Sequence, residues 1–396
     1  MSVISDCLHY LEKLVAFNTV SDIAPESDQP NRPLIDWAKS EFEALGFDTR
    51  VFEYKPGKAD LFAFKGPMTG RTTPGGLLLS GHSDTVGCNP ELWTNSPWSL
   101  TIRDGRAYGL GSCDMKGFIA SAMALARRHP EAAEKGFGVL ITCDEETSMA
   151  GARAAVPELK NLGVMPQLAV VGEPTELSPV FGHKGYMGRA IIIRGRGAHS
   201  SDPTQGINAV KTAALAVEEL NSLEARLKTR REKEFDHPGL PGVPYPTLNI
   251  GSIRGGDNVN RVCAEARLEF DIRPLPKCNA AEIRGMLDES MKRLAAASPA
   301  STTLEVLYPD LDPFINPDPG LRSRIEAIAG REGAFVSYST EASFLQQLGA
   351  TVVLGPGSIR QAHGVDEYIE LSELEKGMTM LKKLWAEFVL PSKIVG

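Results

Sequence analysis

The stretch GGLLLSGHSD, residues 75–84, is a short apolar run that ends in an imidazole and a carboxylate. Three other apolar runs have a similar length: GFGVLITC at 136–143, PQLAVVG at 166–172 and ATVVLGPGS at 350–358. Apolar runs of this length with little polar alternation are typical of strands that are covered on both faces. They predict an α/β domain built on a mixed, largely parallel sheet flanked by helices.

Helical patterns surround these runs. Apolar residues recur at spacings of three and four in the segments 3–17, 32–47, 116–129, 320–333 and 370–390. Residues 187–308 follow a different order, with a strand, a helix, a proline-rich loop (HPGLPGVPYP, 237–246), two strands, a helix and a strand, as in a ferredoxin-like unit. We therefore expect a discontinuous catalytic domain, 1–186 and 309–396, with an inserted α+β lid and dimerisation domain at 187–308.

The composition argues against several classes of protein. The chain has 396 residues and a formal net charge of −8, which gives no electrostatic case for nucleic-acid binding. No apolar stretch is long enough to span a bilayer, and the N-terminus lacks the pattern of a secretory signal. The six cysteines form no CxxC pair, which favours reduced thiols. A cytoplasmic protein is expected.

Chemically active side chains lie at the ends of the apolar runs or a few residues beyond them. They are His82 and Asp84 after the first run, Glu145 and Glu146 after the second, Glu173 after the third and His363 after the fourth. A further carboxylate, Asp114, lies in the glycine-containing loop GLGSCDMKG (109–117) that opens a helix. Because the carboxyl ends of parallel strands share one edge of a sheet, we expect these side chains to converge there.

Each residue also has a simpler interpretation when taken alone. Asp114 could cap the helix that follows it, and Glu173 could cap a helix too. Glu145 and Glu146 could form a solvated turn, and His363 could be a surface loop residue. The metal-site interpretation is favoured because separate runs deliver such side chains to matching positions.

Two imidazoles and three carboxylates form a nitrogen and oxygen ligand set that suits two Zn²⁺ ions, with Co²⁺ or Mn²⁺ able to substitute. The residues are His82, Asp114, Glu146, Glu173 and His363. Two divalent cations would leave this set with a formal charge of about +1, which a hydroxide would neutralise. Such a pair lowers the pKa of a water between the ions and polarises a carbonyl, so the sequence predicts a hydrolytic centre.

Two more carboxylates lie beside this set. Asp84 follows His82 by two positions, so in extended backbone it can accept the imidazole N–H that faces away from the metal. Glu145, next to Glu146, is the candidate general base that takes a proton from water and passes it to the leaving amine.

The motifs resemble a known family. SGHSDTV (80–86), YGLGSCDMKG (108–117), TCDEETSMAGAR (142–153), GEPT (172–175), GAHSSDP (197–203), GGDNVNRVCAEARLEFDIRPLP (255–276) and STEASFLQQLGATVVLGPGSIRQAHGVDEY (339–368) are similar to those of the dinuclear zinc amidohydrolases and peptidases. That family contains deacetylases and desuccinylases of acylated amino acids and glutamate-releasing carboxypeptidases. The resemblance runs from about residue 10 to 390, in order and with the family's spacing.

The resemblance implies a role for each residue of the centre. One ion is bound by His82 and Glu173, the other by Glu146 and His363, and Asp114 bridges the two. The general base is again Glu145, which agrees with the assignment made from the residues alone.

The resemblance also implies roles for residues of the insertion. His199, which alone would be interpreted as a loop residue, is implied to reach the active site of the partner subunit in a homodimer and to stabilise the oxyanion. Asn260 and Arg273 are implied to bind substrate, and the two-pronged guanidinium of Arg273 suits a carboxylate.

The implied activity is hydrolysis of a linear amide. Arg261 and Glu341 favour the branch that removes the acetyl group of N²-acetyl-L-ornithine in arginine biosynthesis, and Glu341 is expected to contact the side-chain amine of that substrate. Glu341 could equally interact with the dipole of a following helix. A desuccinylase, a metallo-dipeptidase or carboxypeptidase, and a non-catalytic metal-binding protein remain alternatives. A nucleotide-binding enzyme is disfavoured, because GLGSCDMKG lacks the GxGxxG register.

Overall fold

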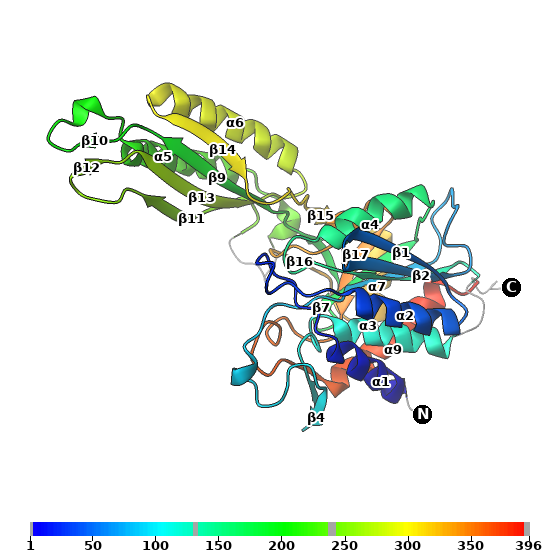
Figure 1. Cartoon of the computed structure of the whole chain (residues 1–396). Coiled ribbons are helices and arrows are strands. Elements are labelled where there is room, and N and C mark those ends of the chain that lie inside the picture. Colours follow the sequence, from blue (N-terminus) through cyan, green and yellow to red (C-terminus); the bar gives the residue numbers. More distant parts are fainter. Residues whose placement is uncertain (1–2, 130–133, 237–242, 392–396) are drawn as a thin grey trace. The chain divides into compact units, whose positions relative to one another are not determined.

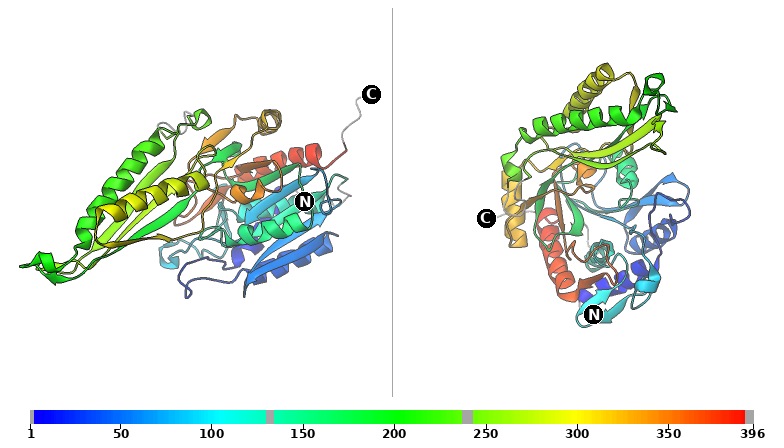
Figure 2. Two further views of the ribbon diagram at one scale, coloured as in Figure 1. Left: turned by 90° about the horizontal axis from the view of Figure 1, so that it is seen from above. Right: turned by 90° about the vertical axis from the view of Figure 1, so that its left-hand side faces the viewer.

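The computed structural model describes residues 3–129, 134–236 and 243–391. The chain divides into two compact units, Met1–Phe181 with Asn316–Ala334 and Thr340–Gly396, and Gly182–Ile315 with Phe335–Ser339. Figures 1 and 2 show both units coloured along the chain. The segment 187–308, expected as the insertion, falls inside the second unit. Residues 237–242 of the expected proline-rich loop lie outside the described residues.

The first unit contains a mixed sheet with a parallel centre. Strands β6, β3, β7 and β17 run in one direction, whereas β1, β2 and β8 are antiparallel to their neighbours. In spatial order the strands are β1 (Asp48–Lys55), β2 (Lys58–Lys65), β6 (Phe137–Thr142), β3 (Leu77–His82), β7 (Leu168–Pro174), β17 (Thr351–Gly355) and β8 (Val180–His183). Every residue of β3, β6 and β7 is buried, which explains their apolar sequences. The predicted α/β class is confirmed.

Helices flank this sheet. Figure 1 shows α4 (Ala150–Asn161) on one side of the sheet, and α3 (Lys116–Arg128) and α9 (Leu371–Phe388) on the other. The unit also contains α1 (Val3–Ala16), α2 (Arg32–Ala44), α7 (Pro319–Ala329), α8 (Ala342–Leu345) and the 3-10 turn η1 (Pro90–Leu92). The alanine-rich α3 packs against both α1 and α9, and its small side chains permit this close packing. Among the described residues, no helix is long and apolar enough to cross a membrane.

A small antiparallel sheet lies apart from the main one in the first unit. It is formed by β4 (Thr101–Arg103), β5 (Arg106–Tyr108) and β18 (Tyr368–Glu370). β5 leads directly into the loop that contains Asp114, and β18 follows the loop that contains His363. Pairing of β5 with β18 therefore joins these two loops at their base.

The second unit has the predicted ferredoxin-like order. Its elements are β9 (Met187–Arg194), α5 (Ala209–Lys228), β11 (Thr247–Gly255), β13 (Glu265–Arg273), α6 (Ala280–Ala297) and β14 (Ser301–Val306). The strands form an antiparallel sheet in the order β11-β13-β9-β14, and apolar residues of α5 and α6 share one core with it. This topology confirms the fold expected for the insertion.

Short elements complete the chain. β10 (Ala198–His199) pairs with β12 (Arg261–Val262) at one end of the second unit's sheet, as Figure 1 shows. β15 (Phe314–Ile315) pairs with the end of β8, and β16 (Ala334–Val336) also pairs with β8. The remaining 3-10 turns are η2 (Pro203–Gln205) and η3 (Lys233–Phe235).

Candidate metal centre

The ends of the central strands deliver candidate ligands to one edge of the sheet. His82 is the last residue of β3 and pairs with Thr142, the last residue of β6. Glu173 lies near the carboxyl end of the neighbouring strand β7. His363 follows β17 in a loop. The edge on which these residues meet is the one where ligand sites form in parallel sheets.

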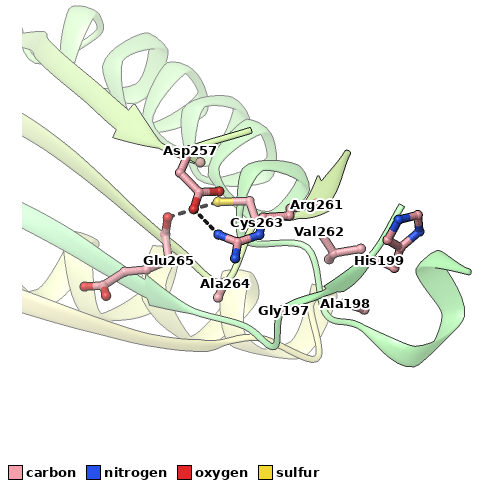
Figure 3. Close-up of a pocket in the computed structure, with 10 residues that line it drawn as sticks. Gly197, Ala198, His199, Asp257, Arg261, Val262, Cys263, Ala264 and Glu265 are labelled. Atoms are coloured by element: carbon pink, nitrogen blue, oxygen red, sulfur yellow. Dashed lines mark hydrogen bonds and ion pairs between the residues drawn. The ribbon is translucent and has the colours of Figure 1, made fainter. Parts of the chain in front are cut away.

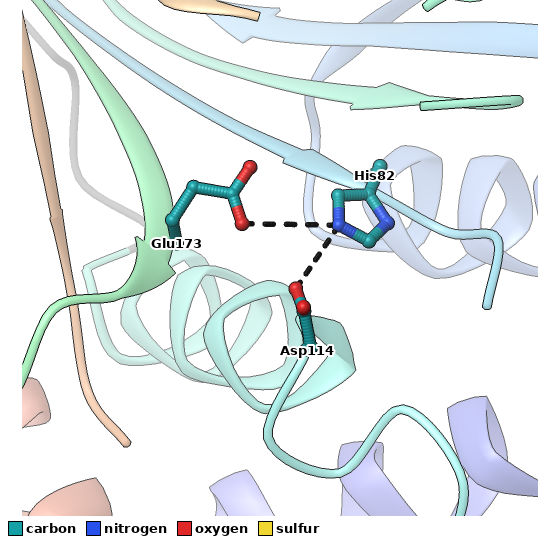
Figure 4. Close-up of side chains that lie close together, drawn as sticks. All are labelled: His82, Asp114 and Glu173. Carbon is teal, nitrogen blue, oxygen red and sulfur yellow. Dashed lines mark hydrogen bonds and ion pairs between the residues drawn. The ribbon is translucent and has the colours of Figure 1, made fainter. Parts of the chain in front are cut away.

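His82, Asp114 and Glu173 form a first cluster (Figure 4). The Nε2 atom of His82 lies 3.2 Å from Oδ1 of Asp114 and 3.9 Å from Oε2 of Glu173. All three side chains are buried. They come from β3, from the loop before α3 and from β7, so only the folded chain brings them together.

Asp114, Glu146 and His363 form a second cluster. The Nε2 atom of His363 lies 2.9 Å from Oε1 of Glu146 and 3.4 Å from Oδ2 of Asp114. The two oxygens of Asp114 therefore face different clusters. In each cluster, one ligand atom from every residue lies within 4.8 Å of the others. The structure thus brings the five expected ligands into two groups that share Asp114.

The charges in these clusters favour a cation. Burial and repulsion from Asp114 raise the pKa of Glu173 well above its usual range. Hydrogen bonds to Asp114 and Glu146 raise the pKa of His363 to about 10. The Oε1 atom of Glu173 is buried and has no hydrogen-bond partner among the described residues. A crowded set of carboxylate oxygens and imidazole nitrogens with an unpaired oxygen fits zinc-type divalent ions.

Asp84 holds the backbone of the two glutamates that follow β6. Its Oδ1 accepts the N–H of Glu145 at 3.1 Å, and its Oδ2 accepts the N–H of Glu146 at 3.1 Å and the hydroxyl of Ser21 at 2.7 Å. His82 Nδ1 instead bonds to the backbone carbonyl of Asp84 at 3.0 Å, with the carboxylate Oδ1 3.6 Å away. The expected bond from His82 to the Asp84 carboxylate is therefore replaced by one to its carbonyl, because amides and a hydroxyl occupy the carboxylate.

Glu145 is placed beside the clusters by this bond to Asp84. Burial, followed by repulsion from Glu173, raises the pKa of Glu145 well above its usual range. A carboxyl with a raised pKa can hold a proton between two steps of a reaction, as a general base and acid must.

A buried network supports the turn before Glu145, and the sequence gives no local signal for it. Asp144 has a left-handed backbone conformation, with φ of 56°. Its carboxylate accepts hydrogen bonds from Lys58 Nζ at 2.7 Å and from the Tyr54 hydroxyl. Lys58 also donates to Asp28 at 2.6 Å, so the buried ammonium joins two carboxylates.

Two of the simpler interpretations are wrong. The N-cap residue of α3 is Met115, and no side chain caps this helix, so Asp114 is not a helix cap. Glu173 lies within β7 and not before a helix.

Glu341 is fully buried in the first unit. Its Oε2 accepts a hydrogen bond from Thr142 Oγ1 at 2.8 Å, and its Oε1 has no partner in the described part of the chain. It precedes the short helix α8 without capping it by a side-chain hydrogen bond. Its contact with a substrate amine stays a prediction.

His199 and Asn260 lie together in the second unit. The Nδ1 atom of His199 lies 2.7 Å from the hydroxyl of Ser201 and accepts the N–H of Ser201 at 3.2 Å. The N–H of Ser200 donates to the carbonyl of Asn260 at 3.0 Å. His199 also lines a pocket of about 670 Å³, together with Arg261 and others (Figure 3).

Arg273 lies far from this pair within the same unit. It ends β13, where its Nε donates to Asp271 at 3.1 Å and its guanidinium lies 4.5 Å from the ring centre of Tyr186. Asn260 comes before the start of β13. Because β13 has nine residues, its two ends are about 26 Å apart at about 3.3 Å per residue.

The sequence matches the model of "Peptidase family M20/M25/M40" over residues 78–387, a range that contains all five candidate ligands. The chain belongs to this family. The predicted family relationship is thereby confirmed, and with it the assignment of the chain as a metallohydrolase of the M20 type.

Relatives of known sequence are similar to the chain over nearly all of its length. An acetylornithine deacetylase of Proteus mirabilis (strain HI4320) is 39% identical over 391 residues, which cover 96% of each chain. An acetylornithine deacetylase of Pasteurella multocida (strain Pm70) is 37% identical and covers 98% of this chain and 99% of its own.

Solved structures share the M20 fold at lower identity. A tripeptidase of Staphylococcus aureus (strain Mu50) has a TM-score of 0.71 at 20% identity and covers 98% of both chains. A dinuclear metal-binding M20 peptidase of Bacillus subtilis has a TM-score of 0.64 at 14% identity and also covers 98% of both chains.

Proposed function

We propose that this metallohydrolase removes the acetyl group from N²-acetyl-L-ornithine and releases L-ornithine and acetate, a step of arginine biosynthesis. The observation that carries the proposal is the identity of 37–39% to acetylornithine deacetylases over 95–98% of this chain. The paired clusters around Asp114 supply a centre suited to amide hydrolysis.

The proposed metal ions are two Zn²⁺, for which Co²⁺ can substitute. His82 and Glu173 would hold one ion, Glu146 and His363 the other, and Asp114 would bridge them, in keeping with the two clusters. When bound, such a pair supplies Lewis acidity that activates water and polarises the acetyl carbonyl.

Glu145 is the proposed general base. It would take the proton of the attacking water as the new C–O bond forms, and then pass that proton to the amide nitrogen as the C–N bond breaks and the amine leaves. Asp84 would hold the backbone of Glu145 and Glu146 in place, because its carboxylate accepts the N–H groups of both residues.

The second unit would supply the remaining groups in a homodimer. Because Ser201 contacts Nδ1 of His199, the Nε2–H of His199 would be the group that stabilises the oxyanion. Arg273 would bind the substrate carboxylate, and Asn260 would bind substrate near His199. N²-acetylornithine is only about 10 Å long when extended. It is too short to touch both ends of β13, so we infer that His199 and Asn260 act on substrate bound by the partner subunit.

Glu341 is the proposed partner of the side-chain amine of ornithine. It is a buried carboxylate with an unpaired oxygen, and it is close enough to Glu145 and Glu173 to raise the pKa of both. A cationic substrate would offset this negative charge. We further propose a cytoplasmic location, which the six free thiols support.

A substrate panel tests the proposed function. Purified protein loaded with Zn²⁺ or Co²⁺ is assayed with N²-acetyl-L-ornithine, N-acetyl-L-norvaline, N-succinyl-diaminopimelate and a dipeptide. We expect the highest kcat/KM for acetylornithine, and a Glu341→Gln variant should lose this preference over acetylnorvaline. A higher kcat/KM for the succinylated substrate or the dipeptide would reject the assignment, and equal losses on both acetyl substrates would remove the role of Glu341.

A further inference from the structure

Glu367 is a buried carboxylate that binds the backbone of a ligand loop. It follows His363 by four positions, and it is only 3% exposed. Its Oε1 accepts the N–H of Cys113 at 2.8 Å and the N–H of Asp114 at 3.0 Å, and its Oε2 accepts the N–H of Gly111 at 2.8 Å. One side chain thus binds three amides of the loop that contains the shared ligand.

The same two loops are joined next to these bonds. The N–H of Gly109 donates to the backbone carbonyl of Glu367 at 3.0 Å, and Tyr108 pairs with Tyr368 across β5 and β18. Asp114 and His363, the ligands contributed by the two loops, both belong to the second cluster. The distance between these ligands therefore depends on how the loops are held together.

The carboxylate of Glu367 suits this role chemically. A buried carboxylate is costly unless hydrogen bonds satisfy it, and charge-assisted bonds from backbone N–H groups are short and directional. With its backbone N–H bound by Glu367, Asp114 can direct one carboxylate oxygen to His82 at 3.2 Å and the other to His363 at 3.4 Å.

We propose that Glu367 is a positioning residue of the metal centre: it fixes the backbone of Gly111–Asp114 so that Asp114 presents one oxygen to each cluster. The proposal rests on the proposed function only for its activity readout, because metal binding can be measured without substrate. Glu367 belongs to neither of the two ligand clusters and acts through the backbone of the loop.

Glu367→Gln tests this role, with Glu370→Gln as a matched control. Glutamine has the same size as glutamate but only one acceptor oxygen. Its NH₂ group would face an N–H group of the loop, so that two hydrogen-bond donors meet and at least one bond is lost. Glu370 is three residues away and forms a partly exposed ion pair with Arg106 at 2.8 Å, so the control removes the same charge from the same segment. Co²⁺ affinity of the metal-free protein is measured by absorbance titration, next to thermal unfolding and steady-state kinetics.

We expect Glu367→Gln to bind at least one Co²⁺ ion about 10- to 100-fold more weakly than the wild type. Its kcat at limiting metal should fall by a similar factor, with KM changed less than about twofold, because the substrate contacts are intact. The control should match the wild type. Wild-type Co²⁺ affinity at both sites in Glu367→Gln would overturn the proposal, whatever its turnover. Absence of acetylornithine hydrolysis by the wild type would count against the proposed function alone.

A second variant covers the case in which Glu367→Gln does not fold. Glu367→Asp keeps the charge, but its side chain is one methylene shorter. It should therefore lose at least one of the three hydrogen bonds to the N–H groups of Gly111, Cys113 and Asp114. Weakened Co²⁺ binding by folded Glu367→Asp supports the role, and unchanged binding overturns it.

Discussion

Two inactive variants should restore each other's activity if His199 acts on the partner subunit. One variant is His199→Ala, which retains Glu145, and the other is Glu145→Gln, which retains His199. Within one chain, the nine residues of β13 separate the region of His199 from Arg273. The separation of about 26 Å is more than twice the length of acetylornithine, about 10 Å. One molecule of substrate therefore cannot contact both His199 and Arg273 of the same chain.

The expected activity follows from counting sites in the heterodimer. One site combines an intact Glu145 with the intact His199 of the partner, and the other site lacks both groups. The heterodimer should therefore have about half the wild-type kcat per dimer. Loss of an oxyanion donor costs about 10²- to 10³-fold and loss of a general base about 10²- to 10⁴-fold, so the heterodimer should exceed both parents by about 50-fold or more.

The assay uses two coexpressed chains with different affinity tags, and only the doubly tagged dimer is collected. A heterodimer of the wild type with the double variant His199→Ala, Glu145→Gln is the reciprocal control. Action across the dimer makes this control nearly inactive, whereas action within one chain gives it half the wild-type kcat. Half activity in the control and none in the complementing pair would refute the reasoning, as would a protein that is monomeric while active.

Three further predictions concern single residues. Glu145→Gln should retain two bound metal ions per chain by elemental analysis and lose about 10²- to 10⁴-fold in kcat, and a rate near that of the wild type would exclude it as the base. Lys58→Met leaves the carboxylates of Asp28 and Asp144 without their shared buried ammonium. Lys55 still lies 3.1 Å from Asp28 and 3.3 Å from Asp144, so the free energy of unfolding should fall by about 1–3 kcal/mol in a urea titration. An unchanged free energy of unfolding would contradict the importance of Lys58. Burial lowers the pKa of Lys184 from 10.5 to about 8, so between these pH values the unfolded chain holds a proton that the folded chain has lost. The free energy of unfolding of the wild type should therefore rise relative to that of Lys184→Met as pH increases through this range, and a constant difference would be evidence against the shift.

The parts of the fold that could be predicted are those with a strong local signal in the sequence. The central strands are buried on both faces, so their apolar runs were sufficient. β1, Asp48–Lys55, was not predicted, because an edge strand that is never fully buried carries charged residues and no apolar run. α4 was not predicted either, since Gly151 and Pro157 lie within it and both disfavour helix in a sequence.

The candidate site shows the same division between local and non-local signals. The expected ligands are recognisable because most of them follow a buried strand, where the parallel sheet brings them together. Glu367 carries no such signal, since the amides that it binds lie 253–256 positions earlier in the chain. The partners of Asp84 were misjudged for a related reason: spacing predicts which way a side chain points, but not which donor reaches it first.

The strands that lead into and out of the second unit are neighbours, since His183 pairs with Phe314 and Gly182 with Ile315. A tight hairpin could join these two positions with little loss of entropy on closing the loop. Replacing the region from β9 to β14 by a two-residue turn would therefore show whether the ligand-bearing sheet folds and binds metal without it.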